Sequence, residues 1–185
     1  MKRYETSESW RRYRTLLAER AGLAPEAEAE EQEALVRGHR LHLDHWRPAA
    51  TPRGTVILVH GGGGNGRVLA PFARLATEAG WEAVAPDLPG YGLTRPAADF
   101  RGDYGEWPAV VAELAARMPG PVVLAGFSVG GLTALLAAQQ APSVRGVIAT
   151  TLLDPTDPDA FSRVSRWPKL ARLLLPLLRR LPPRL

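Results

Sequence analysis

Short apolar runs alternate with amphipathic segments along most of the chain, a pattern that predicts strands followed by helices. Thr55–Val59 is a continuous, mostly β-branched run, as expected of a buried parallel strand. Apolar residues then recur at helical spacing between Trp107 and Met118, after a capping-box pattern formed by Asp103 and Glu106. Such alternation indicates an α/β protein with a mostly parallel sheet.

The same pattern predicts the other elements. Residues 8–20 are expected to form a surface helix, and residues 24–33 an acidic linker with five glutamates. Residues 33–46 predict two antiparallel strands around Gly38. The remaining predictions are a helix opened by Pro71 and lined by Phe72, Leu75 and Ala76, a strand and turn over 81–94, a strand from Val122, a helix ending at Pro142, and a strand over 144–153.

Composition narrows the function classes. The 185 residues contain no cysteine, which excludes disulfides, a thiol nucleophile and thiolate metal ligands. The first residues lack the apolar core of a secretion signal, and no apolar run approaches the roughly 20 residues that cross a bilayer. A soluble cytoplasmic protein without a cofactor is therefore expected, with no signal for an oligomeric state.

The net charge of +4 comes from the C-terminal segment. Residues 161–185 hold seven Lys or Arg and no acidic residue, which leaves 16 basic against 19 acidic residues elsewhere, a net charge of −3. No basic stripe with interleaved aromatics runs through the rest of the chain. Nucleic-acid binding is therefore not expected.

Three of the four histidines lie in the predicted hairpin, at His39, His42 and His45. Their spacing suggests a metal site, but in a strand the first and third face one side and the second faces the other. We therefore expect no metal centre, and we interpret the segment instead as a half-exposed edge strand.

The segment from Val122 to Leu132 combines an apolar run, the sequence Gly-Phe-Ser-Val-Gly and a helix-forming stretch. It predicts a strand, a sharp turn at Ser128 and a helix, the arrangement called a nucleophile elbow. Gly126 and Gly130 provide the small flanks that the tight turn demands. The turn would expose the serine hydroxyl and aim the Val129 N–H at a developing oxyanion. Taken alone, the five residues also fit a glycine-rich turn between a strand and a helix in which the serine has no catalytic role.

A glycine-rich loop, from His60 to Gly66, follows the strand Thr55–Val59. It lacks the Gly-Lys-Ser/Thr step of a phosphate-binding loop. Its glycines instead suit close approach by an acyl group, with the Gly62 N–H as a second oxyanion donor.

Three motifs, each at the end of a predicted strand, together resemble the α/β-hydrolase fold. They are His60-Gly61-Gly62, Asp87-Leu88-Pro89-Gly90-Tyr91-Gly92-Leu93-Thr94 and Gly126-Phe127-Ser128-Val129-Gly130. The resemblance, to serine-nucleophile esterase- and lipase-like members, covers roughly residues 30–185. It implies a three-layer sandwich whose mostly parallel sheet begins with an antiparallel hairpin. It also implies Ser128 as nucleophile, Gly62 and Val129 as oxyanion donors, and an ester or related acyl substrate.

The chain departs from this family in its catalytic acid and base. It supplies only the first six of the family's eight strands, and the family's histidine follows the eighth. No histidine occurs after His60, which in the family is structural. Asp154 lies where some members carry the acid, but a helix cap or turn is the preferred interpretation, since an acid without a histidine orients nothing. We therefore expect this chain alone to have little or no turnover.

The C-terminal segment carries leucines on one face and basic residues on the other, between Lys169 and Leu181. The resemblance implies the start of a cap over the active site, and binding to a membrane surface is the alternative. The predicted organisation is thus an N-terminal helix and linker over 1–30, a hydrolase core over 31–155, and the beginning of a cap over 156–185.

Three functions follow from these observations. The preferred one is a serine hydrolase whose C-terminal third is not in this sequence. The first rival is a catalytically inactive, hydrolase-like binding or interaction protein. The second is a peripheral membrane module that uses the basic C-terminal helix.

Overall fold

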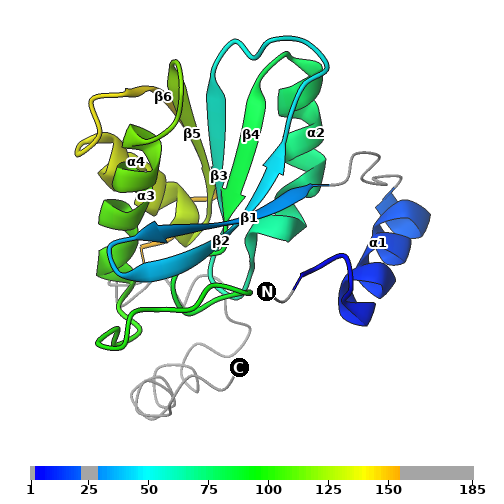
Figure 1. Ribbon diagram of the computed structural model, residues 1–185, viewed down its shortest axis with the longest axis horizontal. Coiled ribbons are helices and arrows are strands. Elements are labelled where there is room, and N and C mark those ends of the chain that lie inside the picture. The colour runs from blue at the N-terminus through cyan, green and yellow to red at the C-terminus, as the bar shows by residue number, and fades with distance from the viewer. Residues whose placement is uncertain (1–2, 22–28, 155–185) are drawn as a thin grey trace.

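A six-stranded sheet with helices on both faces forms the centre of the molecule (Figure 1). The computed structural model describes residues 3–21 and 29–154. The predicted cap or membrane helix over 156–185, and part of the predicted linker, lie outside these ranges. No helix within the described residues is long and apolar enough to cross a membrane.

The strand order is β1-β2-β4-β3-β5-β6. β1 (Glu30–Val36) and β2 (His39–Trp46) form the predicted antiparallel hairpin, and β2 also pairs antiparallel with β4 (Glu82–Pro86). The remaining pairs are parallel and join β4, β3 (Thr55–Val59), β5 (Val122–Phe127) and β6 (Val144–Thr150). The predicted fold class and its six strands are confirmed.

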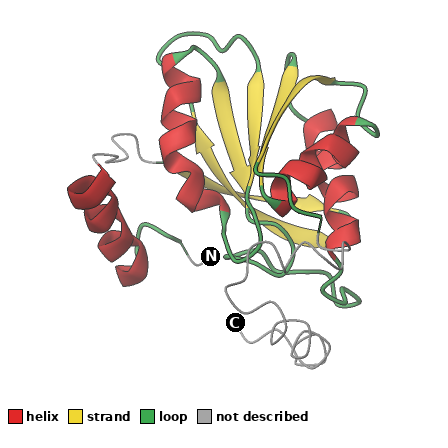
Figure 2. Ribbon diagram, turned by 180° about the vertical axis from the view of Figure 1, so that it is seen from behind, coloured by secondary structure: helices red, strands yellow, loops and turns green. Residues whose placement is uncertain are grey.

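Helices lie on both faces of the sheet (Figure 2). Each face has its own apolar core. On one face, α3 (Trp107–Ala116) and α4 (Val129–Ala138) pack against side chains such as Ile57 and Leu124. On the other, α2 (Ala70–Glu78) packs against Leu58 and Ala85. Trp10 of α1 (Glu8–Ala21) joins this second core, so the predicted N-terminal helix contacts the domain.

Several boundaries and faces differ from the predictions. β1 begins at Glu30, so the end of the predicted linker is strand; Arg47 and Arg40 pair with Glu30 and Glu33 there. Phe72 and Leu75 of α2 are 43% and 61% exposed, while the alanines of the helix face the sheet. Small residues allow α2 to lie close to the sheet, whose face here is also rich in alanine.

The hairpin strand β2 is an interior strand, which corrects the half-exposed edge expected for its histidines. It pairs on one side with β1 and on the other with β4. His39 and His42 are buried completely or nearly so, and each has polar partners. Among the described strands, β1 and β6 form the sheet edges, and Ile148 of β6 is 57% exposed.

Candidate active site

The turn between β5 and α4 contains a single residue, Ser128, which is half-buried. Its backbone has φ 58° and ψ −126°, a conformation that L-residues rarely adopt. Its N–H is held by the Thr150 carbonyl oxygen at 3.0 Å and lies 3.3 Å from Thr151 Oγ1. The predicted strand, sharp turn and helix are therefore present at this position.

The two glycines that flank the serine leave no room for a side chain. A Cβ atom at Gly126 would lie 2.1 Å from the carbonyl oxygen of Gly130. A Cβ atom at Gly130 would lie 2.4 Å from the carbonyl oxygens of both Val59 and His60. Glycine is therefore required where α4 crosses the ends of β3 and β5.

The glycine-rich loop lies beside the elbow. A Cβ atom at Gly61 would lie 3.8 Å from Ser128 Oγ, and one at Gly62 would lie 3.8 Å from Val129 Cγ1. Gly62 itself is exposed, whereas Val129 is buried. Since Val129 is the first residue of α4, its N–H has no partner within the helix. The structure thus brings the three predicted residues Ser128, Gly62 and Val129 together.

His60 is fixed in one neutral form. Its Nε2 accepts a hydrogen bond from the Leu88 N–H at 3.0 Å, so Nδ1 carries the proton and donates it to the Gly61 carbonyl at 2.8 Å. Burial lowers its pKa to about 4. Both ring nitrogens therefore hold backbone of the two neighbouring loops, and neither is available to accept a proton from Ser128.

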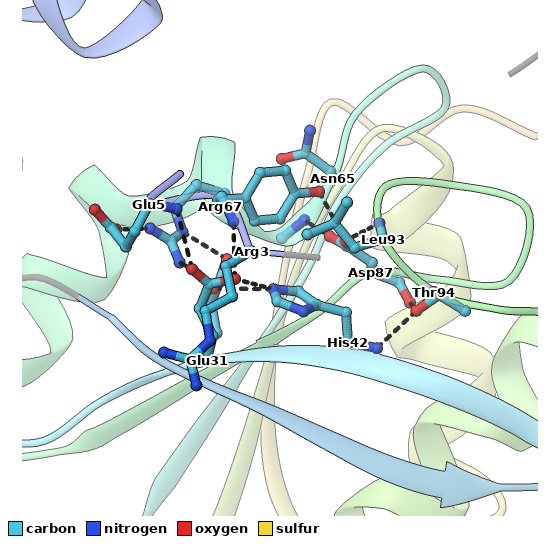
Figure 3. Close-up of polar contacts among 12 residues, drawn as sticks. Arg3, Glu5, Glu31, His42, Asn65, Arg67, Asp87, Leu93 and Thr94 are labelled. Carbon is cyan, nitrogen blue, oxygen red and sulfur yellow. Dashed lines mark hydrogen bonds and ion pairs between the residues drawn. The ribbon is translucent and has the colours of Figure 1, made fainter. Parts of the chain in front are cut away.

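Asp87, at the end of β4, ties the loops behind the elbow to the N-terminal segment (Figure 3). One carboxylate oxygen accepts from the Gly66 N–H at 2.7 Å. The other accepts from the Leu93 N–H at 2.6 Å and the Tyr4 hydroxyl at 2.7 Å. Burial raises the pKa of Asp87, although these donors oppose the shift. The aspartate of the second motif therefore has a structural role, because its carboxylate joins two loops and the N-terminal segment.

Asp154 does not lie at the end of a strand as predicted. β6 ends at Thr150, because the next residue, Thr151, turns the chain with φ 48°. Asp154 follows four residues after the strand, in an exposed position without regular secondary structure. The helix-cap alternative extends into residues outside the described ranges.

The histidines of β2 face as predicted: His39 and His45 on one side, His42 on the other. His42, Asp44 and Glu31 offer ligand atoms within 4.8 Å of one another, as a metal site would. However, the Arg67 guanidinium already lies there, with Nη2 2.6 Å from Asp44 Oδ1 and 3.4 Å from Glu31 Oε1 (Figure 3). The cluster is thus filled by a resident cation.

Arg67 was not singled out from the sequence. It is 2% exposed and makes a two-pronged contact with Asp44, through Nε at 2.8 Å and Nη2 at 2.6 Å. It also pairs with Glu5 and stacks near the rings of Tyr4 and Trp10. Its ion-pair partner Glu5 lies 62 residues away in sequence, so no local pattern indicates the cluster.

The comparisons with known proteins agree with this geometry. A family model described as the alpha/beta hydrolase family matches residues 56–185. The pimeloyl-[acyl-carrier protein] methyl ester esterase of Xanthomonas oryzae pv. oryzae (strain MAFF 311018) is 41% identical over 116 residues, which cover 61% of this chain and 40% of that protein. The enzyme of the same name from Stenotrophomonas maltophilia (strain K279a) is 38% identical over 133 residues, 69% of this chain and 44% of that protein.

The chain thus spans less than half the length of these curated relatives. Among solved structures, the thioesterase domain from the curacin biosynthetic pathway is similar with a TM-score of 0.63 at 24% identity, over 71% of this chain and 47% of that one. A bacterial membrane phospholipase A gives 0.58 at 26%, over 81% and 55%. With the family model covering residues 56–185, the chain belongs to the alpha/beta hydrolase family.

Proposed function

We propose that this chain carries the nucleophile and oxyanion hole of a serine hydrolase that cleaves a carboxylic ester. The Ser128 hydroxyl attacks the carbonyl carbon of the substrate. The N–H groups of Gly62 and Val129 stabilise the negative charge that develops on the carbonyl oxygen. A general base, which is not among these residues, takes the serine proton and returns it to the alcohol as the alcohol leaves. Water then hydrolyses the acyl-serine to the carboxylic acid and the free serine. No metal or cofactor takes part in these steps.

The backbone conformation of Ser128 is the observation that carries this proposal. A non-glycine residue at φ 58° and ψ −126° costs on the order of 1–3 kcal/mol, and such strain gathers at functional sites. The strain here coincides with two close-packed glycines and with an adjacent glycine-rich loop. A glycine-rich turn without a function would carry glycine at the strained position as well.

The general base has no residue in this sequence. His60 is the last histidine of the chain, and both of its ring nitrogens are engaged by backbone groups. Removal of the base from a serine hydrolase lowers the rate by several orders of magnitude. We therefore expect little or no turnover from these 185 residues alone.

The relatives suggest the class of substrate. Those described above are named esterases that act on a methyl ester of a pimeloyl chain held by an acyl carrier protein. An acyl-chain ester is accordingly the proposed substrate of this chain. The site would act on its carbonyl, and the acyl chain and its carrier would be recognised outside the elbow.

Acylation of Ser128 tests the proposal without requiring turnover. The chain is incubated with p-nitrophenyl butyrate, with and without imidazole as a soluble base, and the butyryl adduct is located by intact-mass and peptide mass spectrometry. Imidazole is expected to accelerate adduct formation on Ser128. Ser128→Ala is expected to lose the adduct, and Ser9→Ala, a change at an exposed serine of α1, to keep it.

An inactive hydrolase-like binding protein is the second candidate, favoured by the engagement of both His60 ring nitrogens by backbone groups. It predicts that Ser128 is never acylated, even at high imidazole concentration. Rapid ester turnover without imidazole that is lost in Ser128→Ala would contradict this second candidate. It would also contradict the expectation of little or no turnover, because it would require a base within the chain.

A further inference from the structure

Two tyrosine hydroxyls meet beside the glycine-rich loop. The hydroxyl oxygens of Tyr91, from the turn after β4, and Tyr104, from the 3-10 helix Tyr104–Glu106, lie 2.5 Å apart. The Tyr104 hydroxyl also lies 3.8 Å from the position that a Cβ atom of Gly62 would occupy. Val129 Cγ1 lies at the same distance from that position. The Tyr104 hydroxyl and the Val129 side chain therefore both lie beside Gly62, one of the two residues whose N–H groups are proposed to form the oxyanion hole.

Ring contacts hold the pair in place. The Trp107 ring, 1% exposed, makes edge contacts with Tyr91 at 5.5 Å and with Tyr104 at 4.6 Å between ring centroids. The His60 ring makes edge contacts with both Tyr91 and Trp107. Because His60 also hydrogen-bonds the backbone of the glycine-rich loop, this one residue contacts both the loop and the phenol pair.

Hydrogen bonds fix the segment that carries Tyr104. The Asp103 side chain accepts from the Gly105 N–H at 2.7 Å and caps the short helix as predicted. Glu106 does not complete the expected capping box; its side chain accepts a hydrogen bond from His39 Nε2 at 2.9 Å. His39 Nδ1 accepts in turn from the Ala97 N–H at 3.0 Å. This histidine of the hairpin thus anchors the segment 97–106.

A phenol pair keeps one proton to donate. Two hydroxyl groups carry two protons, and the hydrogen bond between them uses one. Burial, together with the Tyr91 hydroxyl, raises the pKa of Tyr104, so the Tyr104 hydroxyl stays protonated at neutral pH. A donor that is already oriented by its partner costs little to order when a ligand oxygen arrives.

We propose that the hydroxyl of Tyr104, oriented by Tyr91, is a third hydrogen-bond donor of the candidate active site and binds an oxygen of the ester undergoing attack. This inference rests on the proposed function, since it requires the substrate carbonyl to lie between Ser128 and Gly62. Tyr91 is then a positioning residue, because it acts on the substrate only through Tyr104.

Butylboronic acid tests the inference, since it needs no general base within the chain. The Ser128 oxygen adds to the trigonal boron, its proton passes to solvent, and a tetrahedral boronate anion forms whose oxygens occupy the positions of the reaction intermediate. Its affinity is measured by calorimetry for the unmodified chain and for Ser128→Ala, Tyr104→Phe and Tyr91→Phe. Carbon-13 labelling of the tyrosine Cζ atoms follows the hydroxyl environment in the unmodified chain.

The expected result is binding that Ser128→Ala abolishes and Tyr104→Phe weakens by about 10- to 100-fold, as for loss of one hydrogen bond to a charged group. Tyr91→Phe should weaken it less, and the Cζ signal of Tyr104 should shift on binding. Binding that depends on Ser128 but is unchanged in Tyr104→Phe, with no Cζ shift, would overturn this inference alone. The absence of any binding that depends on Ser128 would overturn the proposed function and this inference with it.

Discussion

The cluster around Arg67 and the elbow at Ser128 use polar groups in opposite ways. In the cluster, the guanidinium has carboxylate partners from Asp44, Glu5 and Glu31, and all four side chains are buried or partly buried. At the elbow, the backbone of Ser128 is strained, and the N–H of Val129 begins a helix without a partner in it. The polar groups of the Arg67 cluster thus bind one another, whereas the elbow leaves a backbone donor for another group.

This difference separates a structural site from a candidate catalytic one. Both regions contain buried polar atoms in or beside the sheet, so polarity alone does not distinguish them. The Arg67 cluster ties the N-terminal segment to the sheet, through Tyr4 and Glu5 (Figure 3). Its donors and acceptors are matched to one another, whereas those of the elbow are proposed to stabilise a developing anion.

The largest expected effect comes from Arg67→Ala. The change leaves the carboxylates of Asp44 and Glu31 in the protein interior without their cation, which typically costs about 3–5 kcal/mol. The free energy of unfolding should fall by about that amount in urea titrations. If the substitution accelerates tryptic cleavage after Arg11 in α1 more than cleavage after Arg117 at the end of α3, the N-terminal segment is released first.

Arg12→Ala is the matched control, since Arg12 pairs with Glu8 on the exposed face of α1. Exposed pairs of this kind contribute about 0–1 kcal/mol. If the two variants lose the same stability, the Arg67 cluster is no more than a surface ion pair, and the comparison between the two regions fails.

Local signals made the elbow predictable, and their absence hid the cluster. Gly126, Ser128 and Gly130 lie within five residues, and their spacing follows from one turn. Arg67 instead meets Asp44 across 23 residues, and Tyr4 meets Asp87 across 83. Such pairings depend on which strands become neighbours, and a single sequence contains no pattern that specifies the partner of a buried charge.

The faces of helices were predicted less well than their positions. Hydrophobicity alone placed Phe72 and Leu75 on the buried side of α2, but close packing against the sheet required the alanines there. Likewise, Glu106 matched a capping box by spacing, yet His39 from a distant strand competes successfully for its carboxylate. Tertiary contacts override local preference at these positions.

The next largest effect is the dependence of stability on pH, to which His60 beside the elbow and His42 beside the Arg67 cluster contribute with opposite signs. The pKa of His60 is lowered from 6.5 to about 4 by burial, so the folded chain disfavours its protonation. This stability is present above pH 6.5 and is lost as the pH falls toward 4, by about 3 kcal/mol at 1.36 kcal/mol per pKa unit. Urea titrations between pH 7.5 and about 4 measure the loss.

His60→Gln isolates this contribution, because a glutamine can accept from the Leu88 N–H but does not titrate. His42 responds in the other direction: burial by itself lowers its pKa, but its hydrogen bond to Asp44 and the nearby carboxylates outweigh that and raise it. The pH dependence of the difference between variant and unmodified chain therefore reports His60 alone. An identical pH dependence in both would contradict the fixed neutral form.

Gly130→Ala should cost about 2–3 kcal/mol through overpacking, since the added methyl group would lie 2.4 Å from two carbonyl oxygens of β3 and the residue after it. It should also slow acylation of Ser128 by displacing α4 and the Val129 N–H. Gly146→Ala in β6 is the control, with only an ordinary contact of 3.7 Å to Val123. Equal stabilities of the two variants would show that the elbow is not closely packed.

The smallest expected effect tests the bond by which the N-terminal segment reaches the loops behind the elbow. Tyr4→Phe removes the hydroxyl that donates to Asp87 but keeps the ring against His42 and Arg67. Asp87 retains the N–H groups of Gly66 and Leu93, so the carboxylate stays partnered and the cost should be about 1.5 kcal/mol. The rate of Ser128 acylation should not change. A large loss of acylation with little loss of stability would instead mean that the N-terminal segment acts on the elbow through Asp87, and the two regions would then be parts of one site.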